Sequence, residues 1–271
     1  MASAPLPLSA APIRFGTDGW RGVLGVDITV ERLLPVAAAA AEELAHQAPD
    51  HVDSKIVVIG HDRRFLAPEL AEAIASAVRG VGLDPLLTST AVPTPACSWT
   101  AVQHRALGAL VITASHNPPE WLGLKIKGPF GGSVDGTFTA AVERRLAAGG
   151  VKVPVAGELH HFDARREHLE GLRSKLNLEA ITAGLKAMGL RVIVDPMHGS
   201  AAGCVADLLG TGAQGLVSEI RTHRDPLFGG CPPEPLTPHL QELITEVQVS
   251  GRNGKPAIGL VFDGDGDRIA A

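Results

Sequence analysis

Short apolar runs alternate with segments of helical periodicity along this 271-residue chain, and this alternation constrains the fold more than any other feature. In the N-terminal half, strand-like apolar runs occur at 55–60, 84–88 and 107–113. Helical patterns over 68–81 and 95–104 lie between them. Such alternation builds βαβ units, in which parallel strands form a sheet that helices cover on both faces. Ligands of such sheets bind at loops beyond the carboxyl ends of the strands, so we expect the functional residues there.

A second cycle of the same kind fills the C-terminal half, after a polar and charged segment at His160–Arg173. We therefore expect two α/β domains, each an α/β/α sandwich with a mixed, largely parallel sheet. The predicted helices of the second cycle cover 179–188, 201–209 and 239–249, and its predicted strands cover 191–194, 215–220 and 257–262. The predicted parts of the chain are a flexible tail over 1–12, a first domain over 13–158, a linker over 159–175 and a second domain over 176–271.

The composition excludes several classes of protein. The formal net charge is −5 and no run of Lys or Arg occurs, so the chain offers nucleic acid no basic face. No stretch approaches the ~20 apolar residues that a membrane span requires, and Met1–Pro12 lacks the basic start of a signal peptide. Cys97, Cys204 and Cys231 lie far apart, which fits reduced thiols better than a disulfide framework or a structural zinc site. We expect a cytoplasmic protein with neither a nucleic-acid nor a membrane partner.

Three carboxylates at alternate positions follow the last predicted strand, within Val261–Arg268. Glycines between Asp263, Asp265 and Asp267 let the backbone curl, so that all three side chains can converge on one cation. Hard oxygen ligands favour Mg²⁺ or Ca²⁺ over softer metals. An EF-hand calcium loop is excluded because Arg268 stands where that loop needs glycine. The alternative is a solvated acidic turn, which the preceding apolar strand disfavours.

A second polar loop, Thr113–Pro119, follows the strand predicted at 107–113 and presents Ser115 with His116 and Asn117 beside it. A serine hydroxyl is a poor nucleophile unless a base or a metal activates it. The GxSxG elbow of a serine hydrolase does not surround Ser115. By itself this loop is therefore also consistent with a plain turn that a Ser or Asn side chain caps.

Six segments occur in a defined order along the chain: Gly16–Gly22, Thr113–Pro119, Gly123–Lys127, Asp195–Gly199, Arg224–Gly230 and Asp263–Arg268. In this order they resemble the signatures of the α-D-phosphohexomutases, the phosphoglucomutase/phosphomannomutase superfamily. The resemblance covers nearly the whole chain after the N-terminal tail, and its strength lies in the ordered combination. One departure is Leu122, in the loop after the serine motif, where the family often has an asparagine.

The resemblance implies an enzyme that carries a phosphoryl group on serine and depends on Mg²⁺. Ser115 would hold the phosphoryl group, and an oxygen of that group would bind the metal together with Asp263, Asp265 and Asp267. Phosphoryl transfer depends on positioning and charge neutralisation, which a cation on the transferred group supplies. The implied cofactors are one Mg²⁺ per chain, phosphoserine at Ser115 and glucose 1,6-bisphosphate as an activator.

Four basic side chains complete the implied site. Arg268, directly after the aspartates, and Arg21, on a glycine-flanked loop, would contact phosphate oxygens as charged hydrogen-bond donors. Lys125 matches the proposed general acid/base of the family. His116 is a supporting candidate for proton transfer or hydrogen bonding.

The implied activity is the interconversion of a hexose 1-phosphate and a hexose 6-phosphate, with glucose or mannose as the sugar, through a 1,6-bisphosphate. The segment Phe15–Gly22, together with Gly123–Lys127 and Phe130–Val134, is closer to glucose/mannose-type enzymes than to phosphoglucosamine mutases. The family is usually built of four domains, so C-terminal domains absent from this chain would complete the site, and we expect little turnover from the chain alone. The alternatives are a catalytically weak sugar-phosphate and Mg²⁺-binding module left by truncation, and a metal-dependent phosphatase.

Overall fold

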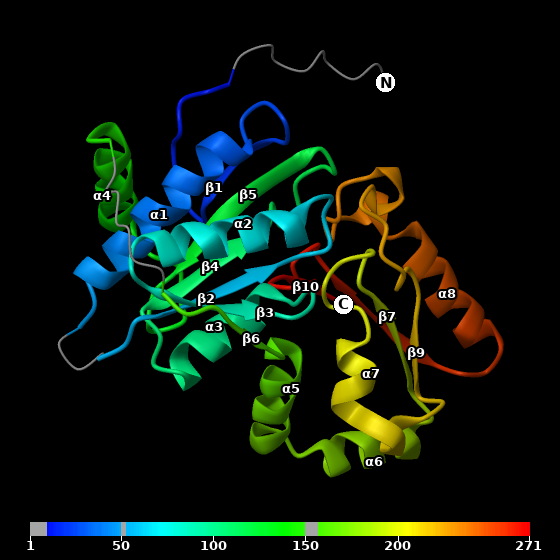
Figure 1. Ribbon diagram of the computed structural model, residues 1–271. Coiled ribbons are helices and arrows are strands. Elements are labelled where there is room, and N and C mark those ends of the chain that lie inside the picture. The colour runs from blue at the N-terminus through cyan, green and yellow to red at the C-terminus, as the bar shows by residue number, and fades with distance from the viewer. Residues whose placement is uncertain (1–9, 50–52, 150–156) are drawn as a thin grey trace.

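The computed structural model describes residues 10–49, 53–149 and 157–271 and contains two sheets that helices cover (Figure 1). The first sheet has six strands in the order β1-β5-β4-β2-β3-β6. Strands β4, β2, β3 and β6 run parallel, whereas β5 pairs antiparallel with both β4 and β1. These strands are β1 (Trp20–Val23), β2 (Ile56–His61), β3 (Asp84–Thr88), β4 (Gly108–Ile112), β5 (Trp121–Lys127) and β6 (His160–Phe162).

Helices cover both faces of this sheet because its central strands are apolar on both sides. Along β2, Val57 and Ile59 belong to one buried cluster and Val58 belongs to the other. The helices α1, α2 and α4 contribute to the first cluster, whereas α3 and the start of α5 contribute to the second. The helices of this domain are α1 (Val30–His46), α2 (Ala67–Gly80), α3 (Thr94–Gln103), α4 (Gly136–Ala147) and α5 (Ala164–Lys175).

The second sheet has four strands in the order β10-β9-β7-β8, of which β9, β7 and β8 are parallel and β10 is antiparallel to β9. Ile193 packs with Leu243 of α8, whereas Val192 and Val194 pack with Leu185 of α6. Both domains are therefore α/β/α sandwiches, as the alternation of strands and helices predicts. The elements of the second domain are α6 (Leu178–Met188), β7 (Arg191–Asp195), α7 (Cys204–Leu209), β8 (Val217–Glu219), α8 (Gln241–Arg252), β9 (Ala257–Phe262) and β10 (Ile269–Ala270), with short 3-10 turns η1 (Gly210–Ala213), η2 (Phe228–Gly230) and η3 (Thr237–His239).

Two segments expected as loops are strands. Arg21 lies in β1 and not on a loop, and the segment after the serine motif, which includes Leu122, forms β5. The two strands pair with Arg21 opposite Gly123. The periodicity did not predict β5 because Lys125 and Lys127 interrupt its apolar run, although both lysines are buried. Strand β5 thereby connects the Arg21 segment to the centre of the sheet.

The segment 159–175, expected as a linker, contains a strand and a helix that fold against the first sheet. β6 pairs parallel with β3, and α5 follows it. Helix α5 approaches α3 closely, since a Cβ at Gly171 would lie 2.2 Å from the ring of Trp99. The sequence pattern did not reveal this helix because few of its side chains are buried, and these are Ala164 and Leu169. The predicted helix at 201–209 also begins later than expected, at Cys204.

Residues 1–9 of the expected N-terminal tail lie outside the described residues, as do residues 150–156 near the end of the predicted first domain. Ala11, in the described part of the tail, donates from its backbone N–H to Asp27 Oδ1 at 2.8 Å. Within 10–49, 53–149 and 157–271, none of the helices combines the length and the apolar character that crossing a bilayer requires.

Candidate active site

Ser115 lies in the loop that joins β4 to β5 and is fully buried. Its φ angle of 52° is in the left-handed region, which a non-glycine residue keeps where its surroundings hold it there. Thr113 supplies part of this restraint, since the Ser115 N–H donates to Thr113 Oγ1 at 2.8 Å. The Ser115 hydroxyl donates to Asp263 Oδ2 at 2.8 Å. The serine loop of the first domain is therefore in direct contact with the aspartate loop of the second.

The aspartate loop, residues 263–267, joins β9 to β10. Asp263 and Asp265 are fully buried, whereas Asp267 is exposed. The backbone N–H groups of Asp267 and Arg268 donate to Asp263 Oδ1 at 3.1 and 3.2 Å, which stabilises the curl of the loop. One carboxylate oxygen from each of the three aspartates lies within 4.8 Å of the other two. The three carboxylates that the alternating pattern predicts are thus brought together.

Gly264 lets the two loops touch. A Cβ at this position would lie 2.5 Å from the carbonyl oxygen of Ser115 and 2.9 Å from Cγ of Pro233. The Gly264 carbonyl oxygen accepts hydrogen bonds from the backbone N–H and the hydroxyl of Ser200, at 3.0 and 3.2 Å. A larger residue at 264 would push the aspartate loop away from the serine.

Lys125, on β5, supplies positive charge to the aspartate loop. Its side chain is 1% exposed, and Nζ lies 2.6 Å from Asp267 Oδ2, 2.8 Å from Asp265 Oδ2 and 2.7 Å from Asp18 Oδ2. Burial lowers the pKa of Lys125, but the three carboxylates outweigh this effect and hold the pKa above its ordinary value. Lys125 is therefore a fixed cation in this arrangement and not a free base.

The aspartate loop has the properties of a site for a hard cation. Burial, followed by the like charges of Asp265 and Asp267, raises the pKa of Asp263 to about 7. Asp265 Oδ1 is buried and has no hydrogen-bond partner among the described residues. These carboxylates therefore carry negative charge that protein donors do not fully satisfy. A divalent cation that prefers oxygen ligands, such as Mg²⁺, fits this set of donors.

His116 lies beside the serine, with Nδ1 at 3.3 Å from Ser115 Oγ. Burial, and then the positive charges of Arg268 and Arg21, lower the pKa of His116 below its ordinary value. The imidazole is therefore neutral at pH 7, so that it can accept a proton and pass it on.

A cleft of about 480 Å³ opens next to His116. Its lining includes Arg14, Arg21 and Arg268 against the single carboxylate of Asp18, so its net positive charge suits an anionic ligand. Arg21 is oriented by Asn117, whose Oδ1 accepts a hydrogen bond from Arg21 Nη1 at 2.9 Å. The structure thus places both predicted phosphate-contacting arginines at one opening.

A larger cavity, of about 690 Å³, lies between α5 and the α7–η1 region. Two of its three arginines are engaged by Asp207, since Arg165 Nη2 donates to Asp207 Oδ2 and Arg173 Nη2 donates to Asp207 O, each at 2.6 Å. Its lining contains no residue of the serine loop, whereas the smaller cleft is lined by His116 and Asn117 of that loop and by Arg268, which directly follows the aspartate loop. The smaller cleft is the candidate active site because the residues beside it in sequence are Ser115 and the three aspartates.

Arg64, which the motifs did not single out, organises the serine loop. It is fully buried, and its Nε lies 3.2 Å from Asp62 Oδ2. The same Asp62 oxygen accepts a hydrogen bond from Thr113 Oγ1 at 2.7 Å. The carbonyl oxygens that accept hydrogen bonds from the Arg64 guanidinium, at 2.7 to 3.0 Å, are those of Ser115, Asn117, Pro118 and Trp121.

A signal for this role was present in the sequence. Asp62, Arg63 and Arg64 directly follow the buried strand β2. Because β2 and β4 are parallel neighbours, their carboxyl ends meet at one edge of the sheet, where the serine loop begins. Charged residues at that edge were therefore candidates for the site.

The second domain covers Arg64, and the first domain in turn supports the aspartate loop. Arg224 Nη2 donates to the carbonyl oxygen of Arg64 at 3.0 Å, and the Arg64 guanidinium lies 4.9 Å from the ring centroid of Phe228. From the first domain, Thr94 Oγ1 donates to Asp265 Oδ2 at 2.5 Å. The motif Arg224–Gly230 thus contributes to the site by holding Arg64 in place.

Comparisons with known proteins identify the family of the chain. A family model described as phosphoglucomutase/phosphomannomutase, alpha/beta/alpha domain I, matches residues 12–151, and the model for domain II matches residues 166–271. A crystal structure from Thermus thermophilus, provisionally named a phosphomannomutase, is 34% identical with a TM-score of 0.80, and the alignment covers 96% of this chain and 56% of that one.

Two curated relatives are equally similar to this chain. A phosphoglucosamine mutase of Synechococcus sp. (strain RCC307) is 31% identical over 100% of this chain and 55% of its own length. A phosphoglucomutase/phosphomannomutase of Thermococcus kodakarensis is 31% identical over 94% of this chain and 54% of its own length. The chain thus spans about half the length of these relatives, whose names specify different sugars. The two domain matches, together covering most of the chain, show that it belongs to the phosphoglucomutase/phosphomannomutase family of the α-D-phosphohexomutase superfamily.

Proposed function

We propose that this chain carries the phosphoserine and metal-binding residues of a phosphohexomutase, with Ser115 as the phosphoryl carrier. The observation that supports this most is the contact of the buried Ser115 hydroxyl with Asp263 Oδ2, at 2.8 Å. A phosphoryl group on Ser115 would add about 1.5 to 2 negative charges beside three carboxylates. Such a group is stable there when a divalent cation balances its charge. The phosphoryl group on Ser115 and the metal site in the aspartate loop therefore depend on one another.

Asp263, Asp265 and Asp267 would hold Mg²⁺, with an oxygen of Ser115 or of its phosphoryl group as a further ligand. The unpartnered Asp265 Oδ1 supports this assignment. When bound, the ion supplies charge neutralisation and orientation of the transferred group. Lys125 would contact Asp265 and Asp267 together with the ion and balance the negative charge that the ion leaves uncompensated.

The proposed reaction moves one phosphoryl group between serine and sugar. A free hydroxyl of a hexose 1-phosphate or 6-phosphate attacks the phosphorus, the bond from phosphorus to Ser115 Oγ breaks, and the hydroxyl proton transfers to Oγ. Neutral His116, with Nδ1 at 3.3 Å from Oγ, is placed to relay this proton. The other phosphate of the resulting 1,6-bisphosphate then returns to Ser115 by the reverse steps. Lys125, the implied general acid/base, is held as a cation by three carboxylates, so its proposed contribution is positive charge beside the aspartate loop and not acceptance of this proton.

Arg21 and Arg268 would hold the phosphate that does not react. Both line the cleft beside His116, and a guanidinium can donate two parallel hydrogen bonds to phosphate oxygens. The substrate class is therefore a hexose phosphate, with glucose or mannose as the proposed sugar. Glucose 1,6-bisphosphate would act as the activator because it can donate the phosphoryl group to unmodified Ser115.

The proposal is tested by intact-mass spectrometry of the chain after incubation with glucose 1,6-bisphosphate and Mg²⁺. We expect the mass to increase by one phosphoryl group in the wild type and not in Ser115→Ala. Ser76→Ala, which removes an exposed hydroxyl from α2, is the matched control and should take up the group normally. Uptake that is unchanged in Ser115→Ala would contradict the assignment.

A coupled assay from glucose 1-phosphate to glucose 6-phosphate distinguishes transfer from hydrolysis. Formation of glucose 6-phosphate that requires Mg²⁺ and Ser115 supports a mutase. Steady release of inorganic phosphate without glucose 6-phosphate would instead identify a metal-dependent phosphatase.

A further inference from the structure

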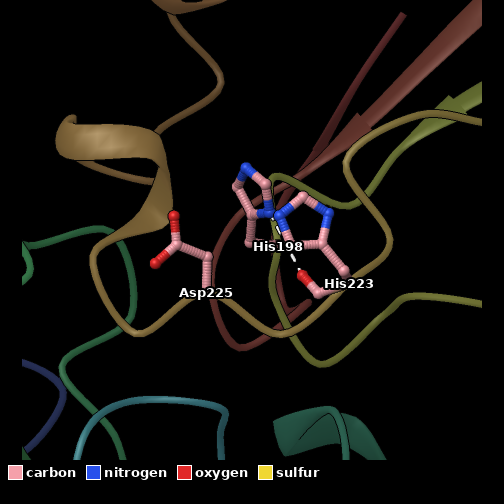
Figure 2. Close-up of side chains that lie close together, drawn as sticks. All are labelled: His198, His223 and Asp225. Atoms are coloured by element: carbon pink, nitrogen blue, oxygen red, sulfur yellow. Dashed lines mark hydrogen bonds between the residues drawn. The ribbon is translucent and has the colours of Figure 1, made fainter.

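A second group of potential metal ligands lies outside the site described above, in the segments that follow β7 and β8. His198, His223 and Asp225 each offer one ligand atom, and these atoms lie within 4.8 Å of one another. The imidazole rings have centroids 4.5 Å apart, and the Asp225 carboxylate lies next to them (Figure 2). The proposed mutase chemistry uses none of these three side chains.

The hydrogen bond of His198 determines which of its ring nitrogens is free. Nδ1 lies 3.1 Å from the carbonyl oxygen of His223 (Figure 2), and because a carbonyl can only accept, Nδ1 carries the hydrogen. In the neutral ring, Nε2 therefore holds the lone pair. A backbone carbonyl bound to the second ring nitrogen is the common support of a metal-ligating histidine. His198, which is 4% exposed, already has the tautomer that ligation through Nε2 requires.

Backbone groups orient the Asp225 carboxylate. Its Oδ1 accepts a hydrogen bond from the N–H of Leu227, and its Oδ2 accepts one from the N–H of Gly229, both at 2.9 Å. A carboxylate oxygen has two lone pairs, so each oxygen keeps one for a metal. Asp225 can thus bind an ion without losing the bonds that hold it.

The segment that carries His223 and Asp225 is anchored by arginines. Arg221 Nε donates to Asp195 Oδ1 at 2.9 Å, Arg63 Nη1 donates to the carbonyl oxygen of Thr222 at 2.7 Å, and Arg224 Nη2 donates to that of Arg64 at 3.0 Å. Ligands on an anchored backbone lose little conformational freedom when an ion binds.

We propose that His198, His223 and Asp225 form a site for a transition-metal ion such as Zn²⁺, distinct from the aspartate loop. Two imidazoles and one carboxylate suit Zn²⁺, whereas Mg²⁺ prefers an all-oxygen set. Tetrahedral Zn²⁺ separates its ligand atoms by about 3.3 Å, and the exposed His223 ring is free to adjust to that spacing. Water would fill the fourth position. The bound ion would cross-link segment 221–230, which covers Arg64, to His198 in the turn after β7.

The test uses Zn²⁺ alone, added to protein in excess Mg²⁺ so that the aspartate loop is occupied. Competition with a chromophoric chelator measures the affinity, and Co²⁺ in place of Zn²⁺ reports tetrahedral ligation through its visible spectrum. We expect one Zn²⁺ per chain in the wild type. His223→Ala and Asp225→Asn should each lower the affinity by at least about tenfold.

His46→Ala, which removes an exposed histidine at the end of α1, is the matched control and should bind Zn²⁺ like the wild type. Because His223 is exposed, His223→Ala should melt at the wild-type temperature without metal and lose the rise in Tm that Zn²⁺ causes in the wild type. Zn²⁺ affinity unchanged in both ligand variants would overturn the proposal. A Co²⁺ spectrum that persists in His223→Ala but disappears in Asp267→Asn would also overturn it, because the ion would then occupy the aspartate loop.

Discussion

Arg64 is the side chain whose loss should disturb the serine loop most. Its buried guanidinium donates to three carbonyl oxygens of that loop and to the carbonyl oxygen of Trp121 at the start of β5, and it balances the buried charge of Asp62. In Arg64→Met the carbonyl oxygens lose their donors and Asp62 loses its counter-charge. Removing one partner of a buried ion pair costs about 3–5 kcal/mol. We expect the free energy of unfolding to fall by that amount, out of the about 5–15 kcal/mol that a domain has in total.

Urea denaturation followed by circular dichroism measures this change from the midpoint and the slope of the transition. Arg166→Met is the matched control, because the Arg166 side chain is 68% exposed, and we expect its effect to stay within about 0.5 kcal/mol. The double variant Asp62→Asn/Arg64→Met leaves no buried charge unpaired. It should therefore be less destabilised than the sum of the two single variants.

Two results would refute this reasoning. One is a loss below about 1 kcal/mol in Arg64→Met, which is the size of an ordinary substitution effect. The other is strict additivity in the double variant, which would mean that Asp62 and Arg64 do not stabilise one another. Uptake of the phosphoryl group, measured on the folded fraction, should also fall in Arg64→Met because Ser115 loses an anchor.

Four further predictions concern other parts of the structure. Folding raises the pKa of Asp263 from 3.8 to about 7. The stability that protonated Asp263 contributes to the metal-free protein is therefore lost as pH rises from about 4 to about 7, by at most about 1.4 kcal/mol per pH unit. Urea titrations in EDTA should show a steeper pH dependence of the free energy of unfolding in the wild type than in Asp263→Asn. Lys125→Gln leaves Asp265 and Asp267 without their cation, so Mg²⁺ should raise its Tm more than it raises that of the wild type. An equal shift would contradict the role of Lys125 as a counter-charge. Gly264→Ala should weaken Mg²⁺ binding by at least about tenfold in calorimetric titrations, because its Cβ would collide with the Ser115 carbonyl oxygen. Unchanged binding would show that the serine loop and the aspartate loop need not be in contact. Gly171→Ala should destabilise the chain by about 1–3 kcal/mol in urea because its Cβ would overlap the ring of Trp99, and a neutral effect would mean that α5 does not pack closely on α3.

The fold class could be predicted from the sequence because the central strands are buried on both faces. Continuous apolar runs such as 55–60, alternating with helical patterns, leave few arrangements other than helices on both sides of a parallel sheet. The predicted secondary structure was wrong where the buried side chains are not apolar, or where few apolar side chains are buried. Strand β5 carries two buried lysines, and α5 buries few of its side chains, so neither shows the periodicity that marks a strand or a helix.

The sequence predicted those parts of the candidate site whose residues are close together in the chain. Asp263, Asp265 and Asp267 lie close together in sequence, so their convergence could be inferred from local geometry. The pairing of Ser115 with Asp263, 148 positions apart, rested on the resemblance of motifs and not on any local pattern. Arg64 and the cluster of His198, His223 and Asp225 were missed, because each consists of residues that acquire a role through contacts between loops.

The sequence by itself determined two α/β/α domains, the polar loops that follow their strands and the residue types available for phosphoryl and metal chemistry. These properties follow from local periodicity and from side-chain chemistry, which act over a few residues. The tertiary structure decided which loops meet. It placed Ser115 against Asp263, neutralised the aspartates with Lys125 and buried Arg64 beneath segment 221–230. Contacts of this kind depend on how the two domains pack, and packing is a property of the whole chain that no local pattern contains.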